Sequence, residues 1–248
     1  MLTGLLGYLI DYVVVSGRDV MSGTDIVSGT STAEDLAGVA VDFEDAHPLE
    51  ILRWAGEKFG DGLVVTASFG DATLVHLVSR AIPSAEVVML DTGYLFAETT
   101  WYAEQLRQRF NLNLRVVEPP PDAEPNLWQT DTDGCCAARK VAPLAHVLEG
   151  RTAWVTGLRR TDSPSRADAP IVHFDPFQSV TKINPMATWT DEAVAHYAAI
   201  ELLPENPLTA RGYASIGCWP CTRPVELGED ARVGRWSGTA KVECGLHQ

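Results

Sequence analysis

Residues 63–73 read LVVTASFGDAT, an apolar run that passes through a serine and a glycine into the start of a helical pattern. The run predicts a strand over Leu63–Ala67, and the apolar spacing that follows predicts a helix over Ala72–Ala81. A hydroxyl, a glycine that allows close backbone approach and the free N–H groups of a helix N-terminus together favour an anion site. The turn is neither a Walker A loop nor a dinucleotide-binding fingerprint, and helix capping alone also explains its serine and glycine.

The alternation of strand and helix continues along the chain. Further strands are expected over Glu86–Leu90, Leu114–Glu118 and Thr152–Thr156, and further helices over Phe96–Phe110 and Cys136–Leu148. This order predicts an α/β fold with parallel strands and helical crossovers, which binds ligands at the carboxyl ends of its strands. The second strand runs into Asp91-Thr92-Gly93, so two neighbouring turns place polar groups at that edge and favour a nucleotide pocket.

Length and proline positions indicate the domain organisation. A chain of 248 residues that is 46% hydrophobic is long enough for one α/β domain with an appended segment. We expect a poorly ordered N-terminal extension over residues 1–33, an α/β nucleotide-binding core over residues 34–205 and a C-terminal segment over residues 206–248. Pro204 and Pro207 mark the end of the core.

The apolar stretch Leu5–Val15 is interrupted by Gly7 and Asp11 and has no basic residue before it. It is shorter than the roughly 18 apolar residues that a transmembrane helix needs. It also lacks the basic start of a secretory signal peptide. We therefore expect neither a membrane anchor nor an export signal, hence a cytoplasmic protein, with Met21 as an alternative start site.

The formal net charge of −14 argues against a general nucleic-acid or anionic-membrane surface, because both need basic stripes. Basic residues are instead paired at three places along the chain, Arg139 with Lys140, Arg159 with Arg160, and Arg232 with Arg235. A solvated face is the ordinary explanation for one such pair. Three pairs, each beside a motif, favour local binding of an anion.

Five cysteines fall into two pairs and a single residue: the tandem Cys135-Cys136, Cys218 and Cys221 of a Cys-x-x-Cys motif, and Cys244. In a reducing cytosol, cysteines more often bind metals or catalyse reactions than form disulfides. Two pairs favour four thiolate ligands to one metal centre. The odd cysteine is typical of a nucleophile, although a terminal thiol without a role also fits the count.

The tandem is expected on a helix, because adjacent helical side chains differ in direction by about 100° and both sulfurs then reach one wide centre. In a strand they would point to opposite faces. The spacing leaves open whether the centre is a four-cysteine zinc site or an iron–sulfur cluster. Lys140 follows Cys136 by four residues, so its ammonium is expected on the same helical face, between this centre and an anionic substrate.

Six stretches of the chain resemble motifs of the adenylyl-sulfate (APS) reductases, which belong to the wider phosphoadenylyl-sulfate (PAPS) reductase family of sulfate assimilation. The stretches are Ser68–Gly70, Leu90–Gly93, Cys135–Val141, Thr156–Arg160, Gly217–Arg223 and Glu243–His247. The tandem, the Cys-x-x-Cys and the Glu-Cys-Gly-Leu-His ending occur together and in order. The resemblance implies a Rossmann-like fold of the adenine nucleotide alpha hydrolase (PP-loop) type, with a C-terminal tail that carries the catalytic cysteine.

The resemblance also implies a cofactor and a set of site residues. The cofactor is one 4Fe–4S cluster, held by Cys135, Cys136, Cys218 and Cys221. By motif, Lys140, Arg232, Arg235 and His247 match the family's contacts to the phosphosulfate group. Ser68, Gly70, Asp91 and Arg159 match positions around the adenosine.

In the reaction that the resemblance implies, the Cys244 thiolate attacks the sulfur of APS, AMP leaves and a cysteine S-sulfonate remains on the enzyme. A thiol of thioredoxin then attacks the Cys244 sulfur and releases sulfite for cysteine biosynthesis. Because Cys244 lies on a terminal segment after Gly234, we expect a mobile tail that closes over substrate and reopens for thioredoxin.

Three alternatives stay open at this stage. The first is a PAPS reductase, or an enzyme that accepts both nucleotides. PAPS differs from APS by a 3′-phosphate, and no residue in the sequence indicates whether that phosphate is bound. An ATP-cleaving PP-loop enzyme resembles the chain near Ser68, but its usual Ser-Gly-Gly-x-Asp-Ser loop differs here at Phe69, Ala72 and Thr73, which leaves less room for a triphosphate. The third is a zinc-stabilised binding module. The sequence also does not indicate whether the protein forms a homo-oligomer or which thiol donor it uses.

Overall fold

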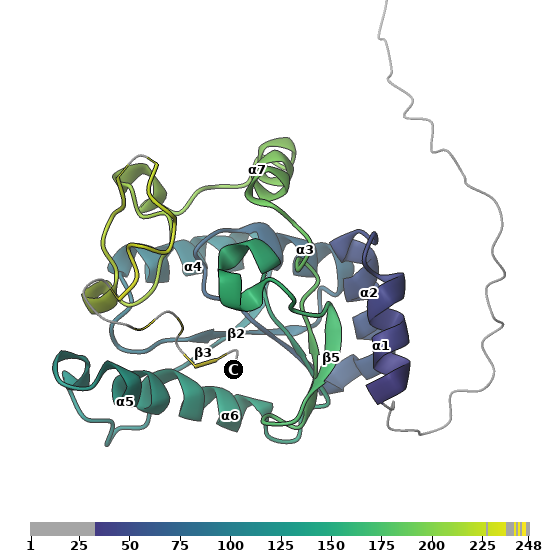
Figure 1. Cartoon of the computed structure of the whole chain (residues 1–248), viewed down its shortest axis with the longest axis horizontal. Coiled ribbons are helices and arrows are strands. Elements are labelled where there is room, and N and C mark those ends of the chain that lie inside the picture. Colours follow the sequence, from purple (N-terminus) through teal and green to yellow (C-terminus); the bar gives the residue numbers. More distant parts are fainter. Residues whose placement is uncertain (1–32, 227, 237–240, 242, 244, 247–248) are drawn as a thin grey trace, which may run out of the picture. The chain divides into compact units, whose positions relative to one another are not determined.

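The computed structural model describes residues 33–226, 228–236, 241, 243, 245 and 246. Within these residues, six strands form one sheet in the order β3-β2-β1-β4-β6-β5 (Figure 1). The strands are β1 Leu63–Thr66, β2 Glu86–Leu90, β3 Asn113–Val117, β4 Ala153–Val155, β5 Val172–Asp175 and β6 Val180–Ile183. The four strands that the sequence predicts, β1 to β4, are confirmed, and all pair in parallel.

The edge formed by β5 and β6 adds two strands that the sequence analysis did not predict to the parallel sheet that it did. β6 pairs in parallel with β4, but β5 pairs antiparallel with β6. This hairpin was not predicted, because its short strands contain charged residues. Lys182 and Asp175 are nonetheless buried, with 3.7 Å between Nζ and Oδ2, and the Lys182 Nζ lies 4.6 Å from the centre of the Trp154 ring. Ion pairing and the aromatic ring therefore allow a lysine inside this strand.

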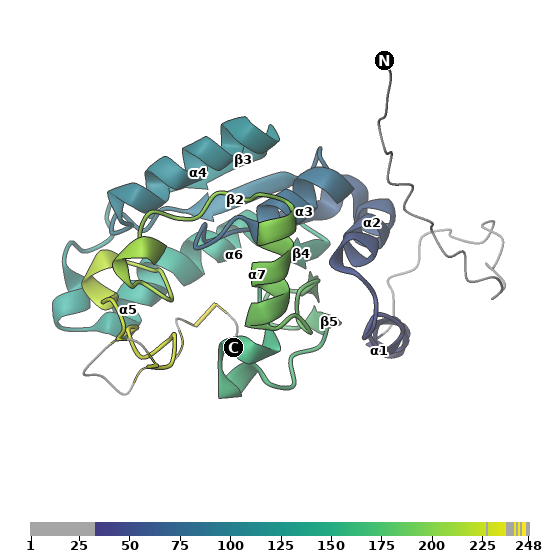
Figure 2. The ribbon, with the colours of Figure 1, turned by 90° about the horizontal axis from the view of Figure 1, so that it is seen from above.

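Seven α-helices are described in these residues, and they cover both faces of the sheet. They are α1 Ala33–Asp42, α2 Pro48–Phe59, α3 Thr73–Ala81, α4 Ala97–Phe110, α5 Thr132–Cys136, α6 Ala142–Leu148 and α7 Asp191–Ile200. Helices α3 and α4 lie on one side of the sheet and α5 and α6 on the other, as Figure 1 and the view from above in Figure 2 show. The helix predicted over Cys136–Leu148 is divided, because a π-helix over Ala137–Val141 separates α5 from α6.

Two apolar clusters fill the space between the sheet and its helices. Val65 of β1 joins the larger cluster with Leu77 of α3, whereas its neighbour Val64 joins the second cluster with Leu144 of α6. Successive residues of a strand face opposite sides, so a fully apolar strand is stable only with helices on both faces. The apolar run that opened the sequence analysis therefore belongs at the centre of the sheet.

Strand β1 lies between β2 and β4. The chain adds β2 and β3 on one side of β1 and then crosses to the other side to add β4, so the direction in which strands are added reverses at β1. Ligands bind outside the carboxyl ends of the strands at such a switch point. The loops after β1, β2 and β4 are therefore the place to look for the site.

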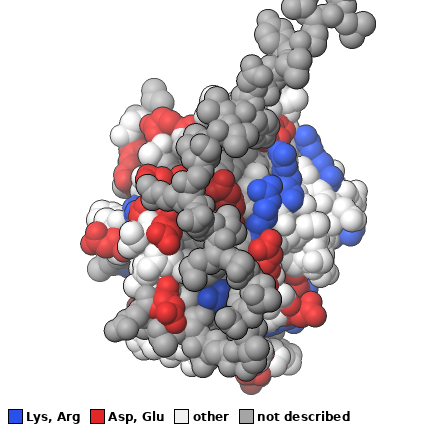
Figure 3. All heavy atoms as spheres, turned by 90° about the vertical axis from the view of Figure 1, so that its right-hand side faces the viewer, with Lys and Arg blue, Asp and Glu red and all other residues white. Residues whose placement is uncertain are grey.

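No helix among residues 33–226 or in the short described stretches after them has the length and apolar character to cross a membrane. The face on the α1 and α2 side shows acidic side chains spread widely, and the basic side chains gather in a small group (Figure 3). The predicted N-terminal extension lies outside the described residues except for Ala33, which begins α1. The boundary between residues 205 and 206 stays a prediction.

Candidate active site

The loop after β1 contains two residues expected near the adenosine, Ser68 and Gly70. Between them, Phe69 is 1% exposed and has a φ of 56°, a left-handed conformation that is uncommon for an aromatic residue. Its carbonyl oxygen accepts a hydrogen bond of 3.0 Å from the buried Asn206 side chain. Asp71 caps α3 by accepting a hydrogen bond of 2.7 Å from the Thr73 N–H. Ser68 is exposed on this fixed turn.

The loop after β2 contains Asp91, the third of these residues. Its Oδ1 accepts a hydrogen bond of 2.8 Å from the Gly93 N–H, and its own N–H donates to the Val117 carbonyl at 2.9 Å. Gly93 has a φ of 74°, where a glycine fits without strain. The carboxylate therefore shapes the turn that follows β2.

Arg159, the fourth residue, follows β4 and is held by two carboxylates. Its guanidinium lies 3.0 Å from Asp162 Oδ1 and 2.7 Å from Asp191 Oδ1. Burial lowers the pKa of Arg159, but the charges of Asp162 and Asp191 outweigh burial, and the pKa lies above its ordinary value. The charge of Asp71 also acts on Arg159, so the loops after β1 and β4 lie near each other. The structure thus places all four residues in loops at the carboxyl edge of the sheet.

Four thiols line one small pocket, and we call this pocket the thiol pocket. Cys135 and Cys136 come from the end of α5, whereas Cys218 and Cys221 belong to the short 3-10 turn Trp219–Cys221 and the residue before it. None of the four forms a disulfide. The other residues lining the pocket are Thr92, Tyr94, Trp128, Thr132, Arg139, Lys140, Pro220, Arg235 and Trp236.

The cysteine tandem lies in a helix, as predicted. Asp131 caps α5 by accepting a hydrogen bond of 2.8 Å from the Gly134 N–H. A side chain at Gly134 would clash, because its Cβ would lie 2.3 Å from the Asp131 carboxylate. Lys140 lies in the π-helix and not in a regular α-helical turn, yet it lines the thiol pocket with Cys136. Such π-turns are rare and are frequent at functional sites.

The Cys-x-x-Cys turn is joined to the loop after β2 by a contact that the sequence analysis missed. The Thr92 hydroxyl lies 3.2 Å from the Cys218 sulfur and accepts a hydrogen bond of 3.2 Å from the Tyr94 N–H. Because its oxygen already accepts this bond, the hydroxyl proton is available to the sulfur. Thr92 lies within the quoted Asp91-Thr92-Gly93 motif, but no local signal connects it with a cysteine 126 positions away.

Burial and the nearby positive charges shift the pKa values of two of these thiols in opposite directions. Burial raises the pKa of Cys135 and of Cys221, and the neighbouring Cys218 raises both further. The positive charge of Lys140 opposes these effects at both thiols. Four thiolates in such a pocket carry more negative charge than Arg139, Lys140 and Arg235 balance, and a metal centre would supply the remaining positive charge.

The described residues are not arranged for a single metal ion. Among residues 33–226 and the described stretches after them, no three histidine, cysteine, aspartate or glutamate side chains are grouped to hold one ion. A zinc ion bound at about 2.3 Å from each sulfur draws its four ligands close together.

Arg139 has a structural part beside the thiols. Its Nη1 donates to the Thr92 carbonyl at 3.1 Å, and its Nη2 donates to the carbonyls of Ala123 and Glu124 at 3.0 and 2.9 Å. The guanidinium also lies 4.8 Å from the centre of the Tyr94 ring. Arg139 therefore ties the π-helix to two loops.

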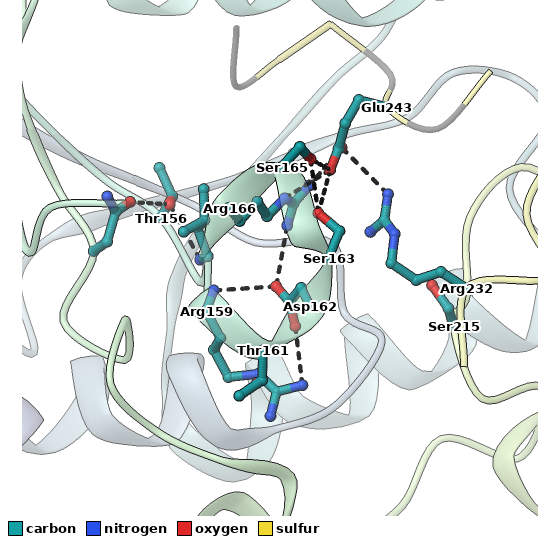
Figure 4. A network of polar contacts seen from close by, with 12 residues as sticks. Thr156, Arg159, Thr161, Asp162, Ser163, Ser165, Arg166, Ser215, Arg232 and Glu243 are labelled. Atoms are coloured by element: carbon teal, nitrogen blue, oxygen red, sulfur yellow. Dashed lines mark hydrogen bonds and ion pairs between the residues drawn. The ribbon is translucent and has the colours of Figure 1, made fainter. Parts of the chain in front are cut away.

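Arg232 and Arg235 approach Trp236 from two positions. Arg235 lines the thiol pocket and lies 4.6 Å from the centre of the Trp236 ring. It packs against Gly217, where an added Cβ would lie 2.2 Å from its Nη2. Arg232 lies 5.7 Å from the same ring and 3.2 Å from the Glu243 carboxylate (Figure 4). Cys244 and His247 lie outside the described residues.

Comparison with known proteins identifies the family. Residues 62–224 match the model of the phosphoadenosine phosphosulfate reductase domain. A curated adenosine 5′-phosphosulfate reductase of Streptomyces coelicolor is 48% identical over 87% of this chain and 96% of its own length. A protein of the same name from Mycobacteroides abscessus is 44% identical over 84% of this chain and 91% of its own length.

Solved structures agree on the fold. A PAPS reductase from Candida auris, crystallised with phosphate, has a TM-score of 0.70 at 24% identity and covers 79% of this chain and all of its own. A Candida glabrata FMN adenylyltransferase has a TM-score of 0.55 at 15% identity and covers 79% of this chain and 69% of its own. The family model covers the loops after β1, β2 and β4 and all four cysteines of the thiol pocket, so the chain belongs to the phosphoadenosine phosphosulfate reductase family and, within it, to the relatives of the APS reductases.

Proposed function

We propose that this protein reduces adenosine 5′-phosphosulfate to sulfite and AMP with electrons from a thiol donor. The observation that carries the proposal is the convergence of four free thiols and Lys140 on one pocket, next to the loop after β2. The identity with APS reductases over most of the chain supports the choice of substrate. The protein is then an oxidoreductase that acts on sulfur, in sulfate assimilation in the cytoplasm.

The thiol pocket fits the cofactor that the family implies. Cys135, Cys136, Cys218 and Cys221 would hold one 4Fe–4S cluster, and the Thr92 hydroxyl supplies a hydrogen bond to one of the ligand sulfurs. The cluster would supply a fixed, polarising group beside the substrate. The reduction needs no electrons from the cluster, because the thiols provide both of the electrons that the sulfur accepts.

Reduction proceeds through three exchanges at sulfur. The Cys244 thiolate attacks the sulfur of APS, the bond from that sulfur to the phosphate oxygen breaks, and AMP leaves with the electron pair. One thiol of thioredoxin then attacks the Cys244 sulfur and releases sulfite, which leaves a mixed disulfide. The second thioredoxin thiol attacks this disulfide, so Cys244 is regenerated and thioredoxin is oxidised by two electrons.

Cationic side chains assist the first exchange. Negative charge moves onto the AMP phosphate as the bond breaks, and fixed positive groups stabilise that charge. Lys140 and Arg235 line the thiol pocket and serve this purpose in the proposal, with Arg232 and His247 as further contacts to the phosphosulfate. Ser68, Gly70, Asp91 and Arg159 are assigned to the adenosine, at the carboxyl edge of the sheet.

The decisive experiment is to mix anaerobically purified protein with APS, without reductant, and to measure the intact mass. We expect a gain of one sulfonate per chain, mapped to Cys244, and no gain in Cys244→Ser. Addition of reduced thioredoxin should release sulfite and restore the original mass. An unchanged mass in the wild-type protein would refute the proposal.

A parallel reaction with PAPS separates the two nucleotides. If the protein is an APS reductase, sulfonation by PAPS should be much slower than by APS at equal concentration. Equal rates would show an enzyme that accepts both. Release of pyrophosphate from ATP would instead indicate the chemistry of ATP-cleaving relatives.

A further inference from the structure

Glu243, the residue before Cys244, is surrounded by hydrogen-bond donors (Figure 4). Its carboxylate accepts five hydrogen bonds, from the hydroxyls of Ser163 at 3.0 Å and Ser165 at 3.3 Å, from Nε and Nη2 of Arg166 at 2.9 and 2.7 Å, and from Nη2 of Arg232 at 3.2 Å. We call these residues the Glu243 cluster. Two nitrogens of Arg166 face the two carboxylate oxygens, which is the paired geometry of strong arginine–carboxylate contacts.

The Glu243 cluster is shielded from water to a degree that ordinary surface pairs are not. The side chains of Glu243 and Arg232 are 19% exposed and that of Arg166 is 11% exposed. Burial raises the pKa of Glu243, but the hydrogen bonds and charge of Arg166 and the charge of Arg232 outweigh burial and hold the pKa below its ordinary value. The carboxylate is therefore charged at neutral pH, and the contact is stronger than that of a solvated pair.

The cluster joins three segments of the chain. Ser163, Ser165 and Arg166 lie in the turns after β4, Arg232 precedes Trp236, and Glu243 lies on the tail. Arg166 also donates to Asp162 at 3.0 Å, and Asp162 binds Arg159. A continuous chain of ion pairs thus connects the residue next to Cys244 with an arginine assigned to the nucleotide.

Contacts of two other tail residues lie on either side of Glu243. The Lys241 ammonium pairs with the Asp133 carboxylate of α5, and Leu246 packs against the second apolar cluster. Asp133 is largely exposed, so its pairing contributes little. Glu243 therefore makes the most extensive polar contact among the described residues of the tail.

We propose that Glu243 is a positioning residue for sulfur transfer: its carboxylate, bound by Arg166 and Arg232, fixes the start of the peptide that carries Cys244. Consecutive Cα atoms are about 3.8 Å apart, so fixing Glu243 restricts the reach of its neighbour to a few ångströms. The inference rests on the proposed function, since it assigns the attack on APS to Cys244. It adds a residue, and the partner Arg166, to which no part in the reaction was given.

The arginines have a second effect on the nucleophile. An unpaired carboxylate next to Cys244 would disfavour the thiolate by repulsion. Bound between Arg166 and Arg232, the charge of Glu243 is balanced. The same contact therefore holds the tail and removes a penalty on the thiolate.

The test is the rate of Cys244 sulfonation in a single turnover at saturating APS, measured with the cluster-loaded protein by intact mass. Glu243→Gln should be roughly tenfold to a hundredfold slower, the size expected for hydrogen bonds to a charged group. The affinity of Glu243→Gln for AMP, measured at equilibrium, should equal that of the wild type, because AMP has no sulfur for Cys244 to attack and its binding does not depend on the position of the tail. Glu243→Asp keeps the charge but shortens the side chain, and its sulfonation rate should lie between those of the wild type and Glu243→Gln.

Two comparisons guard against a general loss of structure. Glu229→Gln breaks a similar but more exposed pair with Arg223 and should leave the sulfonation rate unchanged. Arg166→Lys keeps the charge but loses the paired geometry; it should slow sulfonation, and adding Glu243→Gln to it should cost little more.

The outcomes separate the inference from the function on which it rests. If the wild type gains a sulfonate and Glu243→Gln gains it within twofold of the same rate, the positioning part is refuted and the proposed function stands. A slower Glu243→Gln that also loses AMP affinity refutes it as well, since a disturbed fold then explains the rate. If the wild type gains no sulfonate, both fail.

Discussion

The thiol pocket and the Glu243 cluster both join distant parts of the chain, but different forces hold them. The pocket is tied by backbone hydrogen bonds, such as Trp219 N–H to the Tyr94 carbonyl at 2.8 Å, and by packed rings, with Trp128 and Trp219 centres 5.8 Å apart. The Glu243 cluster is held mainly by ion pairs of Glu243 with Arg166 and Arg232. Packing and backbone hydrogen bonds make the walls of the thiol pocket rigid. Ion pairs are contacts that water or an anionic ligand is able to displace.

The comparison also explains where cations are placed. In the thiol pocket, Lys140 and Arg235 face thiols that become negative only when a metal binds or a proton leaves. In the Glu243 cluster, the arginines face a carboxylate that is already charged. The first arrangement keeps positive charge available for a substrate, whereas in the second the charge of Arg166 is used within the protein.

The largest expected effects come from replacing one cysteine of the thiol pocket and, in a second variant, Cys244. Cys218→Ser should lose iron, visible absorption and sulfonation together, because serine is a poor substitute for a thiolate ligand. Cys244→Ser should retain iron and absorption and lose only sulfonation. Metal analysis, absorption and intact mass check both variants. Equal iron content in Cys218→Ser and wild type would contradict the assignment of the pocket.

A smaller effect is expected from Thr92→Val, which keeps the shape but removes the hydroxyl next to Cys218. The Tyr94 N–H then loses its acceptor, so the free energy of unfolding should fall by about 1–3 kcal/mol while iron is retained. Denaturant unfolding followed by absorption measures it. Thr100→Val, at an exposed hydroxyl with a 3.5 Å contact, is the control and should change stability little.

The smallest effect concerns pH and sharpens the view of the Glu243 cluster. Because the pKa of Glu243 lies below its ordinary value of 4.5, the stabilisation from its charge is fully present above that value and is lost as pH falls through the lower, folded-state pKa. The ratio of sulfonation rates of wild type and Glu243→Gln should therefore stay constant between about pH 8 and pH 5. A ratio that already declines near neutral pH would mean that the carboxylate is not held by the arginines.

Local sequence patterns were sufficient for much of the fold. The strands β1 to β4, the helices α3 and α4 and the helical setting of the cysteine tandem follow from apolar spacing, because neighbouring residues decide these elements. Helix α2 carries the same signal, with Ile51, Leu52 and Ala55 buried on one face after Pro48, and the sequence analysis passed over it. The β5–β6 hairpin was missed for a different reason, since Lys182 is buried only where Asp175 and Trp154 surround it.

For the site, the residue types and their order were enough to expect four metal-binding thiols, a separate reactive cysteine and nearby cations, because thiolate and ammonium chemistry belongs to the side chains themselves. Which groups meet was decided by the packing of the sheet and its loops. The contact of Thr92 with Cys218, the structural use of Arg139 and the binding of Glu243 by Arg166 and Arg232 all join residues far apart in the chain. Such contacts arise only when the loops after β1, β2 and β4 meet at one edge, because the order of strands and not the local sequence brings those loops together.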